Sequence, residues 1–182
     1  MTDSRAHALF LAATLVALIG AVFDWRKGHI PNWLTYAALV LGPMAHAGIA
    51  LGAKESMDVA LEEGAFSVGG ALTCAIVPFL LYRQGALGGG DLKILAALGA
   101  LLQPSLGLEA QLYAFLSAAI LAPARLAYEG KLFSTLKNAF LIGGNLFLPK
   151  SKQRSIEESA LSWFRLGPPI FLGVALTTYL HW

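Results

Sequence analysis

Two aspartates, Asp24 and Asp91, stand directly at the ends of apolar stretches and beside distinctive sequence. Asp24 precedes the run Ile-Pro-Asn-Trp-Leu-Thr at 30–35, and Asp91 follows three glycines at 88–90. A charged side chain close to hydrocarbon costs a few kcal/mol, so an acid in such a place is a candidate for function. These two aspartates are therefore the candidate catalytic residues of the chain.

Two carboxyl groups that meet on one side of a membrane can hydrolyse a peptide bond. At a separation of about 3 Å they do not both ionise easily, so one keeps a proton while the other acts as a base. The base takes a proton from the attacking water, and the protonated partner donates to the scissile carbonyl and then to the leaving amine. The pair titrates as a unit, so the proton is assigned to neither residue. Such a reaction requires no metal, no cofactor and no nucleophilic side chain.

Each aspartate also has a structural alternative. Asp24 could pair with Arg26 or Lys27, and Asp91 could cap a helix that begins at Leu92. The neighbouring sequence favours the functional interpretation. Consecutive glycines adopt backbone shapes closed to other residues, and they leave room for an extended peptide to approach Asp91.

The chain that positions these acids has the composition of a membrane protein. Its 182 residues are 57% hydrophobic and 13% charged, with a mean hydropathy of +0.64, whereas soluble domains are roughly 25% charged. We predict a single domain, residues 1–182, folded as an all-α polytopic bundle of about six transmembrane helices. The candidate spans are Ala6–Phe23, Trp33–Leu51, Ala65–Tyr82, Leu92–Leu102, Leu112–Tyr128 and Leu166–Leu180.

The fourth candidate span, Leu92–Leu102, is too short to cross a bilayer. At about 1.5 Å per residue it reaches only part of the way. It either extends through Gln103 and Pro104 or begins below the membrane surface. The second arrangement would leave the glycine-rich stretch partly inside the protein, where irregular backbone is tolerated.

The basic residues predict which side of the membrane each connection faces. With the N-terminus outside, the connections at 24–32, 83–91 and 129–165 are cytoplasmic, and all Lys and Arg except Arg5 and Lys54 fall on that side. The loop from Lys54 to Glu63 on the other side is acidic. A cleaved signal peptide is disfavoured, because Asp3 beside Arg5 makes a poor basic leader. We therefore predict a multi-pass protein of the inner (cytoplasmic) membrane with both aspartates near its cytoplasmic face.

The stretch 132–148 is apolar but interrupted by polar residues and glycines. A seventh span is one interpretation. We favour an interfacial or re-entrant segment, since the basic residues that follow it would anchor it at an anionic cytoplasmic leaflet.

The remaining reactive residues point to no metal or nucleic-acid site. The single cysteine, Cys74, lies within an apolar span and is interpreted as packing. A net charge of +2 without a basic, aromatic run does not predict nucleic-acid binding. The histidines show no metal-ligand spacing; they are His7, His29, His46 and His181.

The sequence resembles the prepilin peptidases, which are GxGD-class intramembrane aspartyl proteases. Three motifs carry the resemblance, in order along the chain: Asp24 with Ile-Pro-Asn-Trp-Leu-Thr at 30–35, Gly-Gly-Gly-Asp-Leu-Lys at 88–93, and the Pro/Gly motif at 165–173. The resemblance implies that Asp24 and Asp91 are the catalytic pair. It further implies that the substrates are type IV prepilins or pseudopilins, cut between a short basic leader and an apolar helix.

The chain is similar to the short Flp/Tad-type branch of that family. It lacks the paired cysteines and the cytoplasmic region of the long bifunctional members, and asparagine stands at position 32 after Ile-Pro. The resemblance therefore does not extend to N-methyltransferase activity. The oligomeric state is not predicted.

Three other functions remain open at this point. The first is a small transporter subunit whose two acids carry protons or bind a cation. The absence of repeated halves and the placement of both acids at one face count against it. The second is a catalytically silent component of a pilus or secretion system, and the third is a preflagellin-type or other GxGD protease with the same pair.

Overall fold

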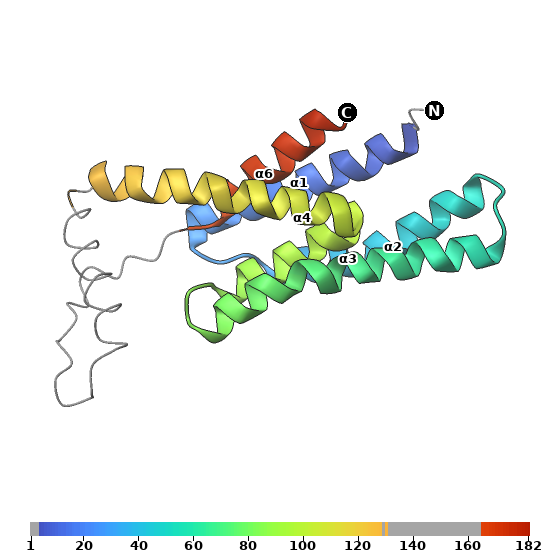
Figure 1. The fold of residues 1–182 in the computed structure, drawn as a ribbon, viewed down its shortest axis with the longest axis horizontal. Coiled ribbons are helices and arrows are strands. Elements are labelled where there is room, and N and C mark those ends of the chain that lie inside the picture. Colours follow the sequence, from blue (N-terminus) through green and yellow to red (C-terminus); the bar gives the residue numbers. More distant parts are fainter. Residues whose placement is uncertain (1–3, 129, 131–164) are drawn as a thin grey trace. The chain divides into compact units, whose positions relative to one another are not determined.

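The computed structural model describes residues 4–128, 130 and 165–182, and these residues form helices and no strands (Figure 1). Four of the helices are long and apolar enough to cross a membrane. The helices are α1 (Ser4–Lys27), α2 (Asn32–Gly52), α3 (Met57–Arg83), α4 (Gly89–Tyr128) and the shorter α6 (Gly167–Leu180). The all-α class is thereby confirmed. Six membrane crossings and the orientation of the N-terminus remain predictions, and the segment 132–148 lies outside the described residues.

The fourth and fifth predicted spans are two arms of α4. Gln103 interrupts this helix with non-helical angles of φ 63° and ψ 174°. Gly99 and Gly107, one turn to either side, lie against each other, so the chain folds back at Gln103. The first arm, from Gly89 to Leu102, rises only about 20 Å at 1.5 Å per residue. It is therefore shorter than the roughly 30 Å that a crossing of the hydrocarbon requires.

The first arm of α4 is the buried centre of the bundle. Its residues from Leu98 to Leu102 are all buried. Glycines on the surrounding helices allow this close packing: Gly20 of α1 lies against Ile94, Gly42 of α2 against Ala100, and Gly70 of α3 against Gly99. Small residues permit such approach of helix backbones in membrane proteins. The arm that begins with Asp91 is thus surrounded by protein.

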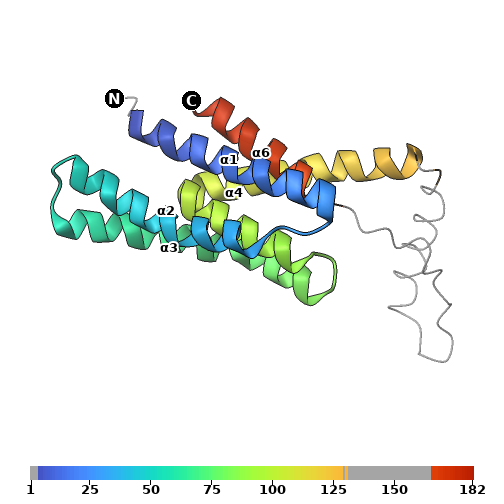
Figure 2. The ribbon, with the colours of Figure 1, turned by 180° about the vertical axis from the view of Figure 1, so that it is seen from behind.

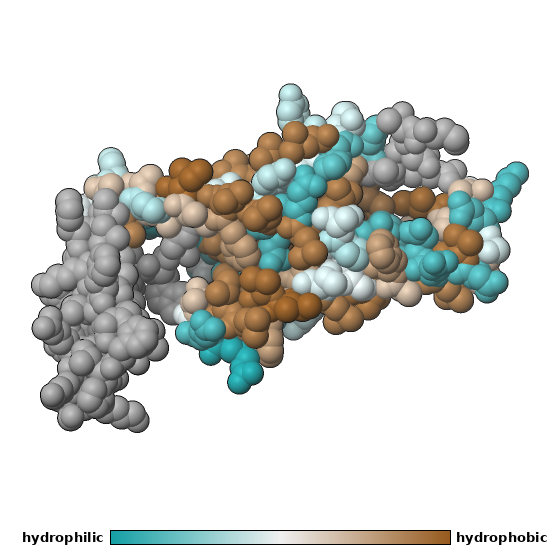
Figure 3. Space-filling view, viewed as in Figure 1, coloured by the Kyte–Doolittle hydropathy of each residue, from teal (hydrophilic) through white to brown (hydrophobic). Residues whose placement is uncertain are grey.

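The outer surfaces of the helices are apolar, as expected of a protein in a bilayer. Figure 3 shows apolar residues over much of one face. Exposed positions on α3 and α4 include Leu72, Ile76, Leu112 and Leu116, each more than half exposed. Around the central arm, α2 packs along α3, and α1 along α6 (Figure 2). Lipid, rather than water, is the environment that suits these faces.

The third helix begins well before the position that the hydropathy pattern predicted. The third begins at Met57 rather than Ala65, because Ser56 accepts a hydrogen bond from the backbone of Val59 and Asp58 follows in the first turn. The acidic residues through Glu63 are therefore helical, and the prediction that they form a loop is wrong.

The described chain divides into two units. One comprises the residues up to Ser117 together with 165–182, and the end of α4 belongs to the other. The site described below lies within the first unit. A single peptidase domain over 1–182 remains a prediction.

Candidate active site

Four helix ends in the first unit carry the predicted motifs. They are the C-terminus of α1 and the N-termini of α2, α4 and α6. Asp24 lies in the last turn of α1, which runs on to Lys27 instead of ending at Phe23 as the hydropathy pattern predicted. The side chain of Asp24 is buried, with 7% of its surface exposed. A buried carboxylate requires hydrogen-bond donors.

The donor to Asp24 comes from the start of α6. The backbone N–H of Gly167 donates to Oδ2 of Asp24 at 2.9 Å. The next two residues, Pro168 and Pro169, have no N–H, and the N–H of Ile170 bonds to Leu166. The first free N–H of α6 is therefore directed at Asp24, where the positive end of the helix dipole also stabilises a negative charge.

Gly167 is needed for this contact. A Cβ at position 167 would lie 2.7 Å from Cβ of Asp24 and 2.8 Å from its Oδ2. Real side chains do not approach so closely, so only glycine lets the two backbones meet here. Sequence reasoning identified the Pro/Gly motif but missed Gly167 as the partner of Asp24. The signal was a glycine followed by two prolines, which leaves one free N–H at a helix start.

Asp91 is the third residue of α4 and is partly buried. Its carboxylate accepts a hydrogen bond from the backbone N–H of Gly88, the residue before the helix. An acid that reaches back in this way caps the helix start. The helix begins at Gly89, so the expectation that Asp91 precedes a helix starting at Leu92 is wrong, and Asp91 instead bonds back to Gly88 from within the first turn.

The two carboxyl groups lie close enough to interact electrostatically with each other. Asp24 comes from the end of α1 and Asp91 from the start of α4. The structure therefore brings the two predicted residues together at one end of the bundle. Two carboxyl groups that close to within about 3 Å of each other can share a proton and activate water.

The flanking motifs also contact each other. Gly90 packs against Ile30. A Cβ added at position 90 would lie 3.5 Å from the Cβ of Ile30. Lys93 donates a hydrogen bond from Nζ to Oδ1 of Asn32 at 3.0 Å, and its ammonium group lies 5.4 Å from the centre of the Tyr36 ring. The first and second motifs are therefore joined by both apolar and polar contacts beside the aspartates.

The glycines before Asp91 act through their size. Gly89 and Gly90 are helical, and none of residues 88–90 has a positive φ. The expectation that they adopt backbone shapes closed to other residues is therefore wrong. At Gly88 a Cβ would lie only 3.0 Å from Oδ2 of Asp91, whereas at Gly90 it would make ordinary contact with Ile30.

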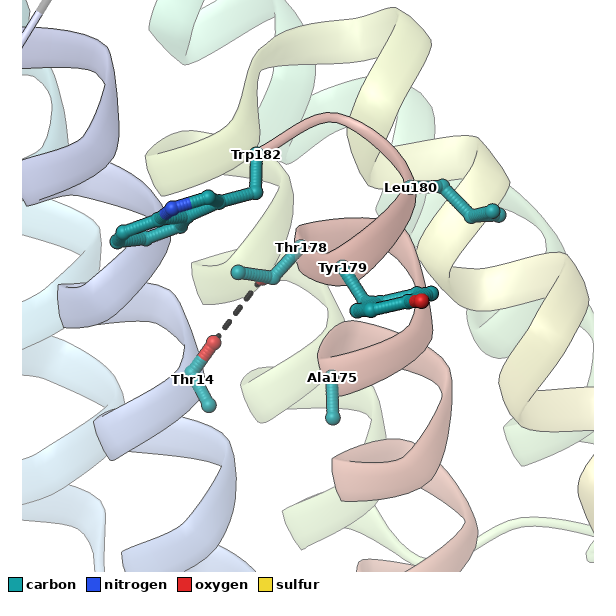
Figure 4. A pocket seen from close by; sticks show the side chains of 6 residues that line it. All are labelled: Thr14, Ala175, Thr178, Tyr179, Leu180 and Trp182. Carbon is teal, nitrogen blue, oxygen red and sulfur yellow. Dashed lines mark hydrogen bonds between the residues drawn. The ribbon is translucent and has the colours of Figure 1, made fainter.

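A pocket of about 640 Å³ opens elsewhere, between the end of α6 and α1 (Figure 4). The hydroxyl groups of Thr14 and Thr178 are hydrogen-bonded within it at 3.0 Å. Thr178 lies about 16 Å along α6 from Gly167, at 1.5 Å per residue. This pocket is therefore separate from the aspartates.

Comparison with known protein families shows which family the chain belongs to. The model of the type IV leader peptidase family matches residues 10–123, which include both aspartates. The chain belongs to this family. No curated protein and no solved structure matches it. The predicted resemblance is confirmed, and a leader-peptidase role of the prepilin type follows from membership.

The matched region runs from α1 into the second arm of α4. Gly167, which hydrogen-bonds Asp24, lies beyond it on α6. Its contribution to the site of this leader peptidase is therefore seen only in the three-dimensional arrangement. No group of three or more metal-binding side chains occurs within the part of the chain that the structure describes.

Proposed function

We propose that this leader peptidase is an intramembrane aspartyl endopeptidase whose catalytic pair is Asp24 and Asp91. The observations that carry the proposal are that the two carboxyl groups lie close enough to interact electrostatically at one end of the bundle and that Asp24 is held by Gly167. Neither acid is a solvated surface residue, because Asp24 is buried and Asp91 is partly buried. Nothing in the geometry favours the transporter alternative over a peptidase.

The mechanism uses the two carboxyl groups in opposite protonation states. The ionised one removes a proton from water as the oxygen attacks the scissile carbonyl carbon. The protonated one donates to the carbonyl oxygen, and the nitrogen of the breaking C–N bond then receives a proton as it leaves. The bonds of Gly167 to Asp24 and of Gly88 to Asp91 keep each carboxylate oriented before the substrate arrives.

The proposed substrates are Flp/Tad-type prepilins or pseudopilins. Their apolar helix would lie in the bilayer against the bundle, which places the junction with the basic leader at the membrane boundary. We propose that this boundary is cytoplasmic, since the basic residues concentrate in the connections on the side of Asp24 and Asp91. The cleavage products are then the free leader and a mature pilin with a new N-terminus. As expected for the short branch, we propose that this N-terminus is not methylated here.

The substrate proposal is tested by reconstituting the full chain in liposomes with a Flp-type prepilin. Mass spectrometry of the products should show a single cut between the leader and the apolar helix. A matched precursor with the leader junction moved several residues into the helix should not be cut at the moved junction. Cleavage of unrelated membrane helices with equal efficiency would contradict the proposed substrate class.

The orientation is tested separately by labelling engineered cysteines with a membrane-impermeant maleimide in intact cells. Labelling from outside is expected for Lys54→Cys and not for Lys27→Cys. The reverse pattern would show that the aspartates face the other side of the membrane.

A further inference from the structure

A second polar cluster lies at the fold-back of α4, away from the aspartates. Nε2 of Gln103 donates to Oε2 of Glu63 at 2.8 Å and lies 3.1 Å from Nδ1 of His46. Nε2 of His46 is in turn 3.0 Å from the carbonyl oxygen of Leu101. All three side chains are partly buried, and they come from α2, α3 and α4. We refer to His46, Gln103 and Glu63 as the clamp.

The clamp lies at a depth where polar groups are costly. Gln103 is twelve residues beyond Asp91, which corresponds to about 18 Å along a helix. A site that far from the end of a bundle falls inside the roughly 30 Å of hydrocarbon. Ionisable residues at such depth are rare and are retained for function.

The clamp completes the hydrogen bonding of a helix end inside the bundle. Pro104 has no N–H for the carbonyl of Ala100, which therefore accepts from the buried hydroxyl of Ser67 at 2.6 Å. The carbonyl of Leu101 is bonded by His46. Carbonyl groups at the end of a helix in hydrocarbon must find such partners. The fold-back at Gln103 therefore depends on side chains from α2 and α3.

The hydrogen bonds of the clamp assign its donors and acceptors. A carbonyl oxygen only accepts, so Nε2 of His46 carries the proton that it shares with Leu101. Nδ1 of the neutral ring then accepts from Gln103, whose second amide hydrogen goes to Glu63. Gln103 is the residue with positive φ, a conformation that costs about 1 kcal/mol or more outside glycine. Its two hydrogen-bonding partners, His46 and Glu63, stabilise it.

Packing leaves the first arm of α4 little freedom to slide. A Cβ on Gly70 would overlap the Gly99 carbonyl and lie 2.9 Å from the Gln103 backbone. On the other side of the fold-back, Gly99 contacts Gly107. A packed helix moves as a rigid rod, so a shift at Gln103 reaches Asp91 at the other end of the same arm.

We propose that Gln103 is a positioning residue for cleavage: held by His46 and Glu63, it fixes the axial position of the arm that presents Asp91 to Asp24. The clamp touches neither the aspartates nor the substrate. It acts through the length and register of the first arm. This inference rests on the proposed function of the two aspartates.

The test combines kinetics with a geometric measurement. Gln103→Met removes both hydrogen bonds while keeping the side-chain length, and Glu63→Leu removes one acceptor. We expect kcat for a Flp-type prepilin to fall about tenfold or more in Gln103→Met with KM little changed, since misplacement by ~1 Å costs about a hundredfold. Glu109→Leu is the matched control, because Glu109 is also on α4 and also bonds a histidine, His181, but lies outside the clamp. Its kcat should stay near that of the wild type.

A disulfide measures the position of the arm without using activity. In a Cys74→Ala background, Ile30→Cys and Gly90→Cys bring two Cβ atoms to about 3.5 Å, within the range that a disulfide requires. Rapid oxidation is expected with Gln103 present. Slower oxidation is expected when Gln103→Met is added.

The exchange Gln103→Glu with Glu63→Gln provides a rescue. Gln103→Glu alone sets two carboxylates against each other and should reduce both kcat and disulfide formation. Adding Glu63→Gln restores a donor opposite the carboxylate. The double variant should recover at least half of the loss in kcat and at least half of the loss in disulfide formation. Gln103→Met with wild-type kcat and wild-type disulfide formation would overturn the proposal. Full activity of Asp24→Asn or Asp91→Asn would instead overturn the proposed function, while the disulfide measurement would still report on the clamp.

Discussion

The backbone N–H of Gly167 donates a hydrogen bond of 2.9 Å to Oδ2 of Asp24, although the two residues are 143 positions apart in the sequence. The bond joins the start of the last described helix to the end of the first. It gives a buried carboxylate a donor from the backbone. The stability of α1 against α6 and the orientation of Asp24 therefore depend on the same contact.

The first prediction concerns this contact. Gly167→Ala should reduce cleavage about a hundredfold, because its Cβ would lie 2.7 Å from Cβ of Asp24 and must displace the carboxylate. Initial rates with a Flp-type prepilin in detergent or liposomes provide the measurement. Gly48→Ala is the control, since a Cβ there meets nothing within 4 Å. Equal rates for the two variants would show that the close approach of Gly167 is not needed.

A second prediction concerns the bond between Lys93 and Asn32. Asn32→Asp keeps an acceptor for the ammonium group and should cleave within about twofold of the wild type. Asn32→Leu removes the acceptor, and an exposed pair of this kind is worth up to about 1 kcal/mol, or roughly fivefold in rate. The same kinetic assay measures both. A larger loss in Asn32→Asp than in Asn32→Leu would contradict a purely hydrogen-bonding role.

Adjacent glycines in α3 provide a prediction for stability. Gly70→Ala should lower the free energy of unfolding by about 1–3 kcal/mol, because its Cβ would overlap the Gly99 carbonyl. Gly69→Ala meets nothing within 4 Å and should be neutral or stabilising by up to ~1 kcal/mol, since alanine favours a helix over glycine. Thermal unfolding in a mild detergent distinguishes the two variants. Equal destabilisation would mean that α3 does not pack closely on the first arm of α4.

The chemistry of a carboxyl pair leads to a fourth prediction. Activation of water by Asp24 and Asp91 needs no metal, so EDTA or 1,10-phenanthroline should leave the rate unchanged. The assay is repeated after dialysis against each chelator. A loss of activity that zinc or another divalent ion restores would require a different mechanism.

The general architecture was predictable from the sequence. The six apolar stretches correspond to helical segments of the structure, and the motifs around Asp24 and Asp91 lie at helix ends. Hydropathy misplaced the start of α3 because Asp58 and its acidic neighbours are helical despite their polarity. A helix that begins at a capping serine, Ser56, can carry charged residues in its first turns.

The contacts between motifs were not predictable, because spacing along a chain does not determine distance. The bond from Gly167 to Asp24 is a backbone interaction that leaves little trace in side-chain type. The fourth and fifth predicted spans are joined directly at the fold-back at Gln103, with no loop between them. Proline at 104 was the local signal, but the partners that satisfy the bend, His46 and Glu63, come from other helices.

The central claim is that Asp24 and Asp91 are both required for cleavage. It is tested most directly by single-turnover cleavage of a co-reconstituted Flp-type prepilin by the wild type, Asp24→Asn and Asp91→Asn, each with a thermal unfolding transition. Asp58→Asn is the control, because Asp58 is an exposed aspartate in the first turn of α3. Folded Asp24→Asn and Asp91→Asn should each lose at least ~10³-fold in rate, while Asp58→Asn cleaves normally. Wild-type cleavage by either folded variant would contradict the two-aspartate mechanism.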